Sequence, residues 1–349
     1  MRRAFLCLGL IVAGAAFSAC GGSHDAVSTT MMTTARNTRP SYAGKPSPTF
    51  PRHLWVCLDG PIGPANVAIQ MAVEKGFFAD VGLSVSAGVP VVPRRPVRYV
   101  SAYTDDIAVT QQPQAAMGKA RGAPIVAVGS LISQPTAALI WLKKSGIQGV
   151  ADLRHKTIAV PGIPYQKEIL ESILEEAGIA PDEVEVKNVN YKLVPVLLAG
   201  KADAIFGGSW NIEGVALREL GLKPVIKRVE EFGVPAYDEL VVITRADRAA
   251  REPQVVRKFM SALSRGVAAA KRNPALASKL IEYGGSRYRG VSKRQTNAEL
   301  RATLPLLSPH GYFDPDQTGG LLTWMHAQGM IGDQPSISGL FTNRYLSGG

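Results

Sequence analysis

Three residues with chemically useful side chains follow one short apolar stretch in the second half of the chain. Trp210, Asn211 and Glu213 come after "ADAIFGG", which has the composition of a strand that ends at two glycines. At the start of a helix, Trp210 and Glu213 would lie on one side, because they are three residues apart. An indole can stack on a flat ring, and a carboxylate can accept hydrogen bonds. The alternative is that Trp210 packs in the core and Glu213 stabilises the helix N-terminus through its dipole.

Polar residues also follow three other strand-like stretches. They are Asp59 and Asn66 in "LDGPIGPAN", Gln111 and Gln112 in "VTQQP", and Tyr165 in "VPGIPYQKE". Because ligands of open α/β sheets bind beyond the carboxyl ends of the strands, we expect a binding site where these loops meet. The alternatives are that Asp59 orders its own turn, that Asn66 caps a helix, and that the glutamines are solvated.

Motifs that would indicate an enzyme are missing from the sequence. The five histidines include no HExxH pair, and no GxSxG, P-loop or GxGxxG motif stands in a suitable context. Of three cysteines, Cys7 and Cys20 belong to the N-terminal region, so Cys57 alone permits no internal disulfide and no Cys-based metal site. We therefore expect a binding protein without catalytic turnover, metal or other cofactor.

The N-terminus has the composition of an export signal. Arg2 and Arg3 precede an apolar run, 4–17, which is too short for a membrane span of about 20 residues. Small residues next to Cys20 resemble a bacterial lipoprotein signal, although Phe17 departs from its usual aliphatic residue. We predict a signal peptide over 1–19, lipidation of Cys20, and a disordered tether over 20–52 that is rich in Ser, Thr, Pro and Gly. The alternative is ordinary cleavage without lipidation.

The positive charge does not indicate nucleic-acid binding. The formal net charge is +11, and basic residues are spread along the chain apart from one cluster at 93–98. Because no zinc spacing or RNP-like stretch accompanies them, we interpret the charge as a solvated surface that favours an anionic membrane or cell wall. A ligand-phosphate role for Arg94, Arg95 or Arg98 is the less favoured alternative.

Strand-like and helix-like stretches alternate over the part of the chain that would position these residues. Strands are expected at 53–59, 83–89, 106–110, 124–131, 156–162, 184–189, 202–208, 222–229 and 238–245. Helices are expected at 64–78, 166–178, 191–200 and 253–274, since their apolar residues recur at helical spacing. This alternation predicts an α/β fold with mostly parallel sheets, followed by a mainly helical C-terminal part.

The order of several motifs resembles that of a known family. "AVEKGFFADVGLSV", "ADLRHKTIAVPG", "LEEAGIAPDEVEV" and "LLAGKADAIFGG" are similar to segments of periplasmic solute-binding proteins for nitrate, sulfonates and thiamine pyrimidine precursors. The resemblance runs in order from about residue 53 to 285. It implies a two-lobed periplasmic binding protein fold of type II, each lobe a mixed sheet flanked by helices, with two hinge crossings. Lobe one would comprise 53–138 and 240–349, and lobe two 139–239, with "AALIWL" (137–142) and "DELVVI" (238–243) as the crossings and hinge bending around a ligand.

The resemblance also assigns a role to the residues named above. Segments similar to "GGSWNIEG" occur in binding proteins for the aminopyrimidine precursor of thiamine, which implies that Trp210 stacks on a ring whose N–H groups bond to Glu213. Tyr237 and Asp238, in "FGVPAYDEL", would lie at the returning crossing and supply a second aromatic wall. Relatives that bind anions carry Ser or Thr at the helix start where this chain has Ile163, Pro164 and Tyr165. This departure favours a flat heterocycle, such as an aminopyrimidine or a flavin, over sulfonate, taurine or nitrate.

The same resemblance implies a cellular location and binding partners. We expect an extracytoplasmic monomer that is anchored to the membrane by lipid and delivers a small molecule to an ABC permease. One alternative is the related fungal synthase of the thiamine pyrimidine, which uses a Cys-rich iron motif and a sacrificial His. This chain has no Cys cluster, so its sequence does not support that chemistry. A surface receptor that feeds a signalling protein is another alternative.

Overall fold

The computed structural model describes residues 51–89, 96–284, 290–332 and 336–346. The predicted signal peptide, Cys20 and most of the predicted tether lie outside these residues, as do Arg94 and Arg95. Within them, no helix is both long and apolar enough to cross a membrane.

The first of two sheets has the strand order β2-β1-β3-β10-β4. Strand β1 pairs in parallel with β2 and β3, whereas β10 lies antiparallel between β3 and β4. The strands are β1 (Arg52–Cys57), β2 (Leu83–Gly88), β3 (Ile107–Thr110), β4 (Ile125–Ile132) and β10 (Leu240–Arg245). One strand of this sheet thus comes from a distant part of the chain.

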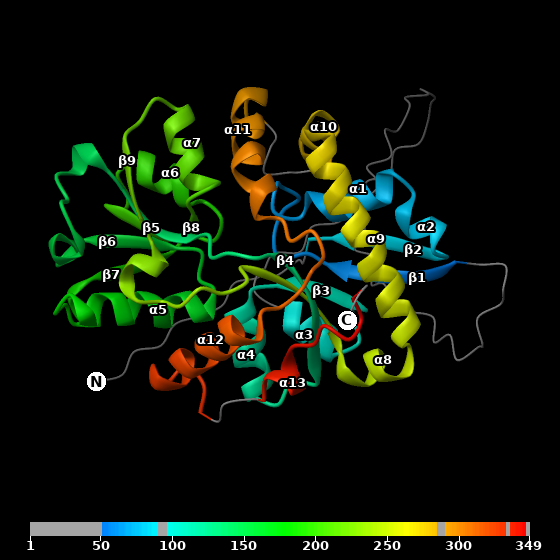
Figure 1. Ribbon diagram of the computed structural model, residues 1–349. Coiled ribbons are helices and arrows are strands. Elements are labelled where there is room, and N and C mark those ends of the chain that lie inside the picture. Colours follow the sequence, from blue (N-terminus) through cyan, green and yellow to red (C-terminus); the bar gives the residue numbers. More distant parts are fainter. Residues whose placement is uncertain (1–50, 90–95, 285–289, 333–335, 347–349) are drawn as a thin grey trace, which may run out of the picture. The chain divides into compact units, whose positions relative to one another are not determined.

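The second sheet has the order β7-β6-β8-β5-β9 and is built from one continuous stretch. Strand β6 pairs in parallel with β7 and β8, and β5 pairs antiparallel with β8 and β9. The strands are β5 (Ala137–Leu142), β6 (Thr157–Val160), β7 (Glu185–Asn188), β8 (Ala204–Ser209) and β9 (Pro224–Arg228). Figure 1 shows this sheet and its helices in green.

The α/β prediction is confirmed, and each expected strand has a counterpart in one of the two mixed sheets. The expectation of mostly parallel sheets is wrong, because the strand pairings described divide equally between parallel and antiparallel. The reason is that β5 and β10, which follow the two passages of the chain between the sheets, run opposite to their neighbours. Alternating helices and strands predict βαβ units but give no signal for such passages.

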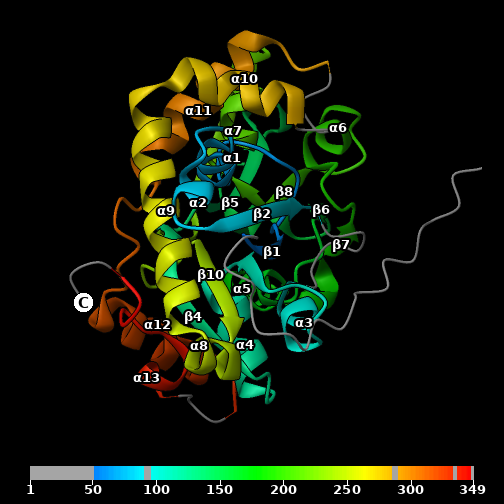
Figure 2. The same cartoon turned by 90° about the vertical axis from the view of Figure 1, so that its right-hand side faces the viewer.

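Helices cover the faces of both sheets, and the chain becomes mainly helical after β10, as predicted (Figures 1 and 2). The helices that precede β10 are α1 (Val67–Glu74), α2 (Phe77–Asp80), α3 (Pro96–Ser101), α4 (Gln112–Ala120), α5 (Pro164–Glu176), α6 (Leu193–Leu198) and α7 (Glu213–Glu219). Those that follow it are α8 (Ala246–Arg251), α9 (Pro253–Arg272), α10 (Pro274–Gly284), α11 (Lys293–Thr303), α12 (Pro315–Ala327) and α13 (Ile337–Leu340). Short 3-10 segments include η1 (Lys143–Ser145), η2 (Val150–Leu153), η3 (Pro181–Glu183), η4 (Val229–Phe232) and η6 (Leu304–Leu306).

Helix α9 illustrates why these segments fold as they do. Its buried side chains include Val256, Phe259, Met260, Leu263 and Val267, which recur at helical spacing and pack with α1 against one face of the first sheet. Burying a side chain of this size contributes about 1.5–3 kcal/mol. Proline stands at the first position of α9 and again at that of α10, where its missing N–H costs no intrahelical hydrogen bond. The amphipathic stripe read from the sequence is therefore the face that is buried.

Two segments join the sheets. We call 133–136, between β4 and β5, the outward crossing, and 233–239, between η4 and β10, the return crossing. Helix α11 packs against both α10 and α7, so it touches helices associated with each sheet (Figure 1). The lobe boundaries at 138/139 and 239/240 stay a prediction. The first would fall within β5, after the outward crossing, and the second between the return crossing and β10.

Candidate ligand-binding site

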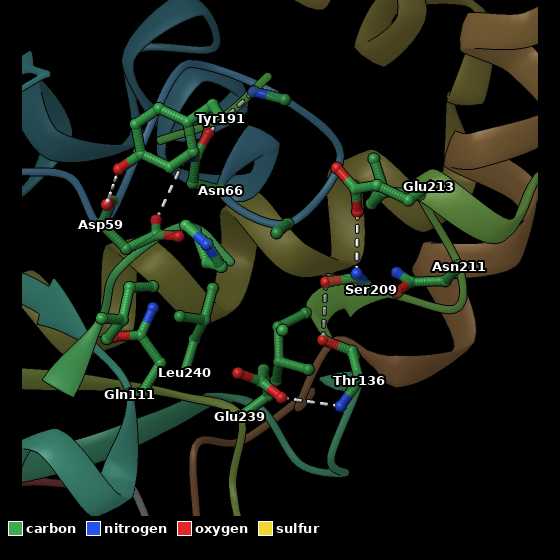
Figure 3. Close-up of a pocket in the computed structure, with 18 of the residues that line it drawn as sticks. Asp59, Asn66, Gln111, Thr136, Tyr191, Ser209, Asn211, Glu213, Glu239 and Leu240 are labelled. Atoms are coloured by element: carbon green, nitrogen blue, oxygen red, sulfur yellow. Dashed lines mark hydrogen bonds between the residues drawn. The ribbon is translucent and has the colours of Figure 1, made fainter. Parts of the chain in front are cut away.

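A cavity of about 140 Å³ lies where loops from both sheets meet the two crossings. Its walls come from the loop after β1, the start of α4, both crossings, and the loops after β6, β7 and β8 (Figure 3). The predicted site residues that line it are Asp59, Asn66, Gln111, Asn211 and Glu213. The structure thus brings together five side chains from distant parts of the sequence, at the sheet edge where ligands are expected.

The loop between β1 and α1 is held by its own side chains. The Asn66 amide oxygen accepts a hydrogen bond from the Gly63 N–H (3.0 Å), and its Nδ2 donates to Asp59 Oδ1 (3.3 Å) and to the Pro61 carbonyl (3.2 Å). Asn66 stands at the N-cap position of α1 but makes no capping bond to the helix. Burial raises the pKa of the Asp59 carboxyl. Asn66 therefore organises a cavity wall instead of capping the helix.

The loop between β8 and α7 is tied to other parts of the chain. Glu213, buried at the first position of α7, accepts a hydrogen bond from the Ser209 N–H (2.7 Å). The Ser209 hydroxyl lies 3.1 Å from that of Thr136 in the outward crossing. Asn211 Nδ2 donates to the Thr303 hydroxyl of α11 (2.7 Å). This loop thus takes its shape from the outward crossing and from α11.

Two side chains of the cavity wall have buried acceptors without a partner. Gln166 Nε2 donates to the Gly207 carbonyl (3.4 Å), which fixes Oε1 as the acceptor end of the amide. The Thr303 hydroxyl donates to the Glu299 carbonyl (2.8 Å), so it accepts from Asn211 and leaves Asn211 Oδ1 as an acceptor. Among the residues the structure describes, neither oxygen has a hydrogen-bond partner. Such acceptors are costly to bury and fit a ligand that brings N–H donors.

Glu239 is a cavity residue that the sequence analysis missed. It ends the return crossing, and its Oε2 accepts hydrogen bonds from the backbone N–H groups of Thr136 (2.7 Å) and Ala137 (3.3 Å). The hydroxyls of Tyr165 and Tyr237 donate to its Oε1 (3.2 Å) and Oε2 (3.4 Å). Burial raises the pKa of the Glu239 carboxyl, and the bonds from Thr136, Ala137 and Tyr165 oppose that rise.

The charge of the cavity wall has one sign. Asp59, Glu213 and Glu239 supply three carboxyl groups, and no lysine, arginine or histidine occurs among the described residues that line the cavity. Arg98, a candidate from the basic cluster, belongs to α3 and is not part of the wall. The cavity is therefore rich in acceptors and poor in cationic groups.

Four predicted site residues, Tyr165, Trp210, Tyr237 and Asp238, are not part of the cavity wall. Tyr165 and Tyr237 are fully buried in an apolar cluster. The Trp210 indole N–H donates to the Pro135 carbonyl (3.2 Å), and the Arg228 guanidinium lies 4.5 Å from the centre of its ring. Trp210 is thus attached to the outward crossing, and ligand contact by the rings of Tyr165, Trp210 and Tyr237 stays a prediction.

Asp238 faces a different region from its neighbour Glu239. The Ser130 hydroxyl donates to Asp238 Oδ1 (2.6 Å), and Oδ2 has no partner among the described residues. Burial raises the pKa of the Asp238 carboxyl to about 6. Its backbone N–H donates to the Gln112 side chain (2.7 Å), so of the two predicted glutamines only Gln111 lines the cavity.

Thr136, Gln166, Tyr191 and Ser209 also line the cavity and were not predicted. The Tyr191 hydroxyl, from the loop after β7, donates to the Asp59 carbonyl (3.2 Å) and so joins loops of the two sheets (Figure 3). Its ring lies 3.6–3.7 Å from where a side chain at Gly60 would begin. Gln166 follows the predicted residue Tyr165, and Glu239 follows the predicted residue Asp238. Their position next to a predicted residue is the sequence signal that could have identified them. Within the described residues, no group of three His, Cys, Asp or Glu side chains is placed to hold a metal.

Comparison with known proteins identifies relatives along most of the chain. A family model described as NMT1/THI5 like matches residues 64–277. A Haemophilus influenzae protein named for thiamine biosynthesis is 34% identical over 65% of this chain and 72% of its own length. A formylaminopyrimidine-binding protein from Halalkalibacterium halodurans is 26% identical over 81% of this chain and 87% of its own. A Legionella pneumophila protein named 4-amino-5-hydroxymethyl-2-methylpyrimidine phosphate synthase is 24% identical over 81% and 89%.

Solved structures show the same architecture at low sequence identity. The periplasmic aliphatic sulphonate-binding protein of Escherichia coli superposes with a TM-score of 0.66 at 13% identity, covering 84% of this chain and 99% of its own. A Candida albicans protein described as having the generic periplasmic binding protein fold has a TM-score of 0.63 at 15% identity, covering 84% and 97%. Since the family model matches more than half of the sequence, the chain belongs to the NMT1/THI5-like family and has the two-lobed periplasmic binding protein fold.

Proposed function

We propose that this protein is the extracytoplasmic solute-binding component of an ABC importer and that its cavity holds a small planar nitrogen heterocycle of the aminopyrimidine class. The observation that carries the proposal is the cavity wall, with three carboxyl groups and two unpartnered amide oxygens. The relative that is named as a formylaminopyrimidine-binding protein supports it. Binding rather than turnover is the function proposed.

An aminopyrimidine matches such a wall because of the chemistry at its edge. Its exocyclic amine lies beside a ring nitrogen, so a carboxyl group can meet both with two parallel hydrogen bonds. The remaining amine hydrogen would meet an acceptor such as Asn211 Oδ1 or Gln166 Oε1, once that side-chain amide turns its buried oxygen toward the cavity. A donor that pairs with a buried acceptor removes a desolvation cost of about 1–3 kcal/mol. Affinity would thus depend on the ligand's N–H groups.

A sulfonate or nitrate ligand is the less favoured alternative. An anion in this cavity would face Asp59, Glu213 and Glu239 without a cationic side chain among the described wall residues. Bringing like charges together in a site with little water costs free energy. The likeness to sulfonate-binding structures, at 13–15% identity, indicates the fold and not the ligand.

Lipid anchoring at Cys20 and a flexible tether remain part of the proposal. They rest on the basic, apolar and small-residue order of the N-terminal sequence, which lies outside the described residues. Such an anchor would hold the binding protein near its permease, and a monomer is sufficient for this role.

Calorimetry with a panel of compounds tests the proposal. We expect 4-amino-5-hydroxymethyl-2-methylpyrimidine or its formylamino analogue to bind, and a flavin, taurine and nitrate to bind weakly or not at all. Glu213→Gln keeps an acceptor for the Ser209 N–H but removes the charge, and it should weaken binding roughly tenfold to a hundredfold.

Glu219→Gln is the matched control for this experiment. Glu219 lies on the same helix, pairs with Arg294 and does not line the cavity, so its replacement should leave the affinity unchanged. Tight binding of taurine or nitrate, with no heat of binding from either aminopyrimidine, would contradict the proposed ligand class.

A further inference from the structure

We propose that Glu239 is a ligand-binding residue that also joins the two crossings, and that Tyr165 and Tyr237 are positioning residues that orient its carboxyl group. The inference rests on the proposed function of the cavity and names a further residue of that site. It assigns Tyr165 and Tyr237 a role through Glu239 in place of direct stacking on the ligand.

The first step is the position of Glu239 between the crossings. It is the last residue of the return crossing, and its Oε2 accepts from the N–H groups of Thr136, which ends the outward crossing, and Ala137, which begins β5. One carboxyl group therefore bonds across the two segments that connect the sheets. Movement of one crossing relative to the other would stretch the 2.7 Å bond from Thr136.

The second step is the role of the two tyrosines. Both side chains are fully buried in an apolar cluster and neither lines the cavity, yet both hydroxyls donate to Glu239. A buried phenol needs an acceptor, and here both phenols share one carboxyl group. Gln166 Nε2 donates to the Tyr165 oxygen (3.2 Å), so a chain of hydrogen bonds runs from the cavity residue Gln166 through Tyr165 to Glu239.

The third step is the capacity left for a ligand. Oε2 accepts from the N–H groups of Thr136 and Ala137 and lies 3.4 Å from the Tyr237 hydroxyl, and the Thr136 hydroxyl interacts with the same carboxyl group. Oε1 accepts from the Tyr165 hydroxyl. Since the two oxygens of a carboxylate together offer about four acceptor positions, an N–H group of a ligand in the cavity would bind at Oε1, beside that hydroxyl. The titratable groups that face Glu239 are Tyr165 of α5 and Tyr237 of the return crossing, and Glu230 of η4 interacts in turn with Tyr237. A ligand bound to Oε1 would therefore be held by the group that fixes the crossings.

Glu239→Gln tests ligand contact. The variant keeps the size of the side chain but presents an N–H group to the N–H donors of the outward crossing, so binding of the aminopyrimidine should weaken at least tenfold. Glu219→Gln, the same exchange at a residue outside both the cavity wall and the crossings, is the matched control and should bind within twofold of the natural protein. Equal affinity of Glu239→Gln and the natural protein would overturn the proposal.

Tyr165→Phe and Tyr237→Phe test positioning, through the pH dependence of ligand affinity. Tyr165→Phe removes a hydroxyl that stabilises the charged form of Glu239, which raises the pKa of that carboxyl group, and Tyr237→Phe removes a second and longer bond of the same kind. The midpoint of the affinity profile should therefore move to higher pH, whichever protonation state binds the ligand. Tyr345→Phe, a buried control, should not move it. A purely structural role would lower stability and leave the midpoint in place, which would contradict the assignment.

A measurement without ligand separates this inference from the proposed function. Spin labels at the exposed positions Val73 of α1 and Val186 of β7 report the distance between the helices and strands of the two sheets. Glu239→Gln should shift or broaden that distance distribution in the free protein. If no aminopyrimidine binds the natural protein, the proposed function and the ligand contact of Glu239 both fail. The distance between the two spin labels then decides whether Glu239 joins the crossings. An unchanged distribution would refute that role.

Discussion

The loop between β1 and α1 and the loop between β8 and α7 both line the cavity, but they are held by different partners. The first is closed on itself through Asn66, whose three side-chain hydrogen bonds all end within residues 59–66. The second is bonded to the outward crossing through Ser209 and Trp210, and to α11 through Asn211. The first loop is thus held mainly by its own side chains, with one hydrogen bond from Tyr191 of the other sheet, whereas the second loop depends on its surroundings.

Because the two loops are held by different partners, we expect them to contribute to ligand binding in different ways. A self-contained loop keeps its shape when the lobes move, so its ligand contacts are organised before binding. A loop bonded to a crossing and to α11 would move with them, so we expect its ligand contacts to be completed only if the lobes close. Substitutions in the first loop should act mainly on fold stability, and those in the second mainly on affinity.

The largest effect is expected for Asn66→Ala. The change removes three hydrogen bonds and leaves the buried Gly63 N–H without its partner, which should lower the free energy of unfolding by about 2–4 kcal/mol. Urea denaturation of the free protein measures this. Asn297→Ala, within α11, is the control and should be close to neutral because alanine favours helices. A loss as small as that of the control would remove the contrast between the loops.

An intermediate effect is expected for Asn211→Ala. The variant loses the bond to Thr303 and the unpartnered Oδ1, so ligand affinity should fall about tenfold while the free energy of unfolding falls by about 1 kcal/mol. Calorimetry and urea denaturation of the same preparation give both values. A stability loss equal to that of Asn66→Ala, with unchanged affinity, would show that both loops are structural walls.

The smallest effect is expected for Tyr191→Phe. This change removes one hydroxyl, which donates to the Asp59 carbonyl and links loops of the two sheets. A single neutral bond contributes about 0.5–1.5 kcal/mol, so dissociation of the ligand should accelerate roughly twofold to tenfold. Stopped-flow measurements test it. Slower dissociation, or slower association alone, would contradict a role in holding the closed cavity.

The order of strands and helices could be predicted because it depends on local patterns. Apolar residues at helical spacing identified α5 and α9, and short apolar runs before glycines identified β6 and β8. The antiparallel direction of β5 and β10 could not be predicted this way, since it depends on where the chain passes between sheets. Periodicity reports which side of an element is apolar and does not identify its neighbours.

The candidate site could be located by sequence but not resolved to individual side chains. At two places the cavity residue is the neighbour of the predicted one: Gln166 beside Tyr165, and Glu239 beside Asp238. Successive side chains point about 100° apart on a helix and to opposite faces of a strand, so an uncertainty of one residue at an element's end changes the answer. Asp59 was found because it ends a predicted strand, and Asn66 and Glu213 were found because each stands at the start of the next predicted helix.

The position of β10 in the first sheet determines the order in which the two sheets can fold during synthesis. Strand β4 ends at residue 132, but its neighbour in the sheet, β10, ends only at residue 245. Strand β4 also forms isolated bridges with Leu307 and Phe341, which are synthesised later still. The second sheet needs nothing beyond residue 228. On a ribosome, therefore, the sheet that is begun first is completed last, and β4 stays unpaired while the second sheet forms. A chain that stops before β10 would expose the edge of an apolar strand, a known cause of aggregation.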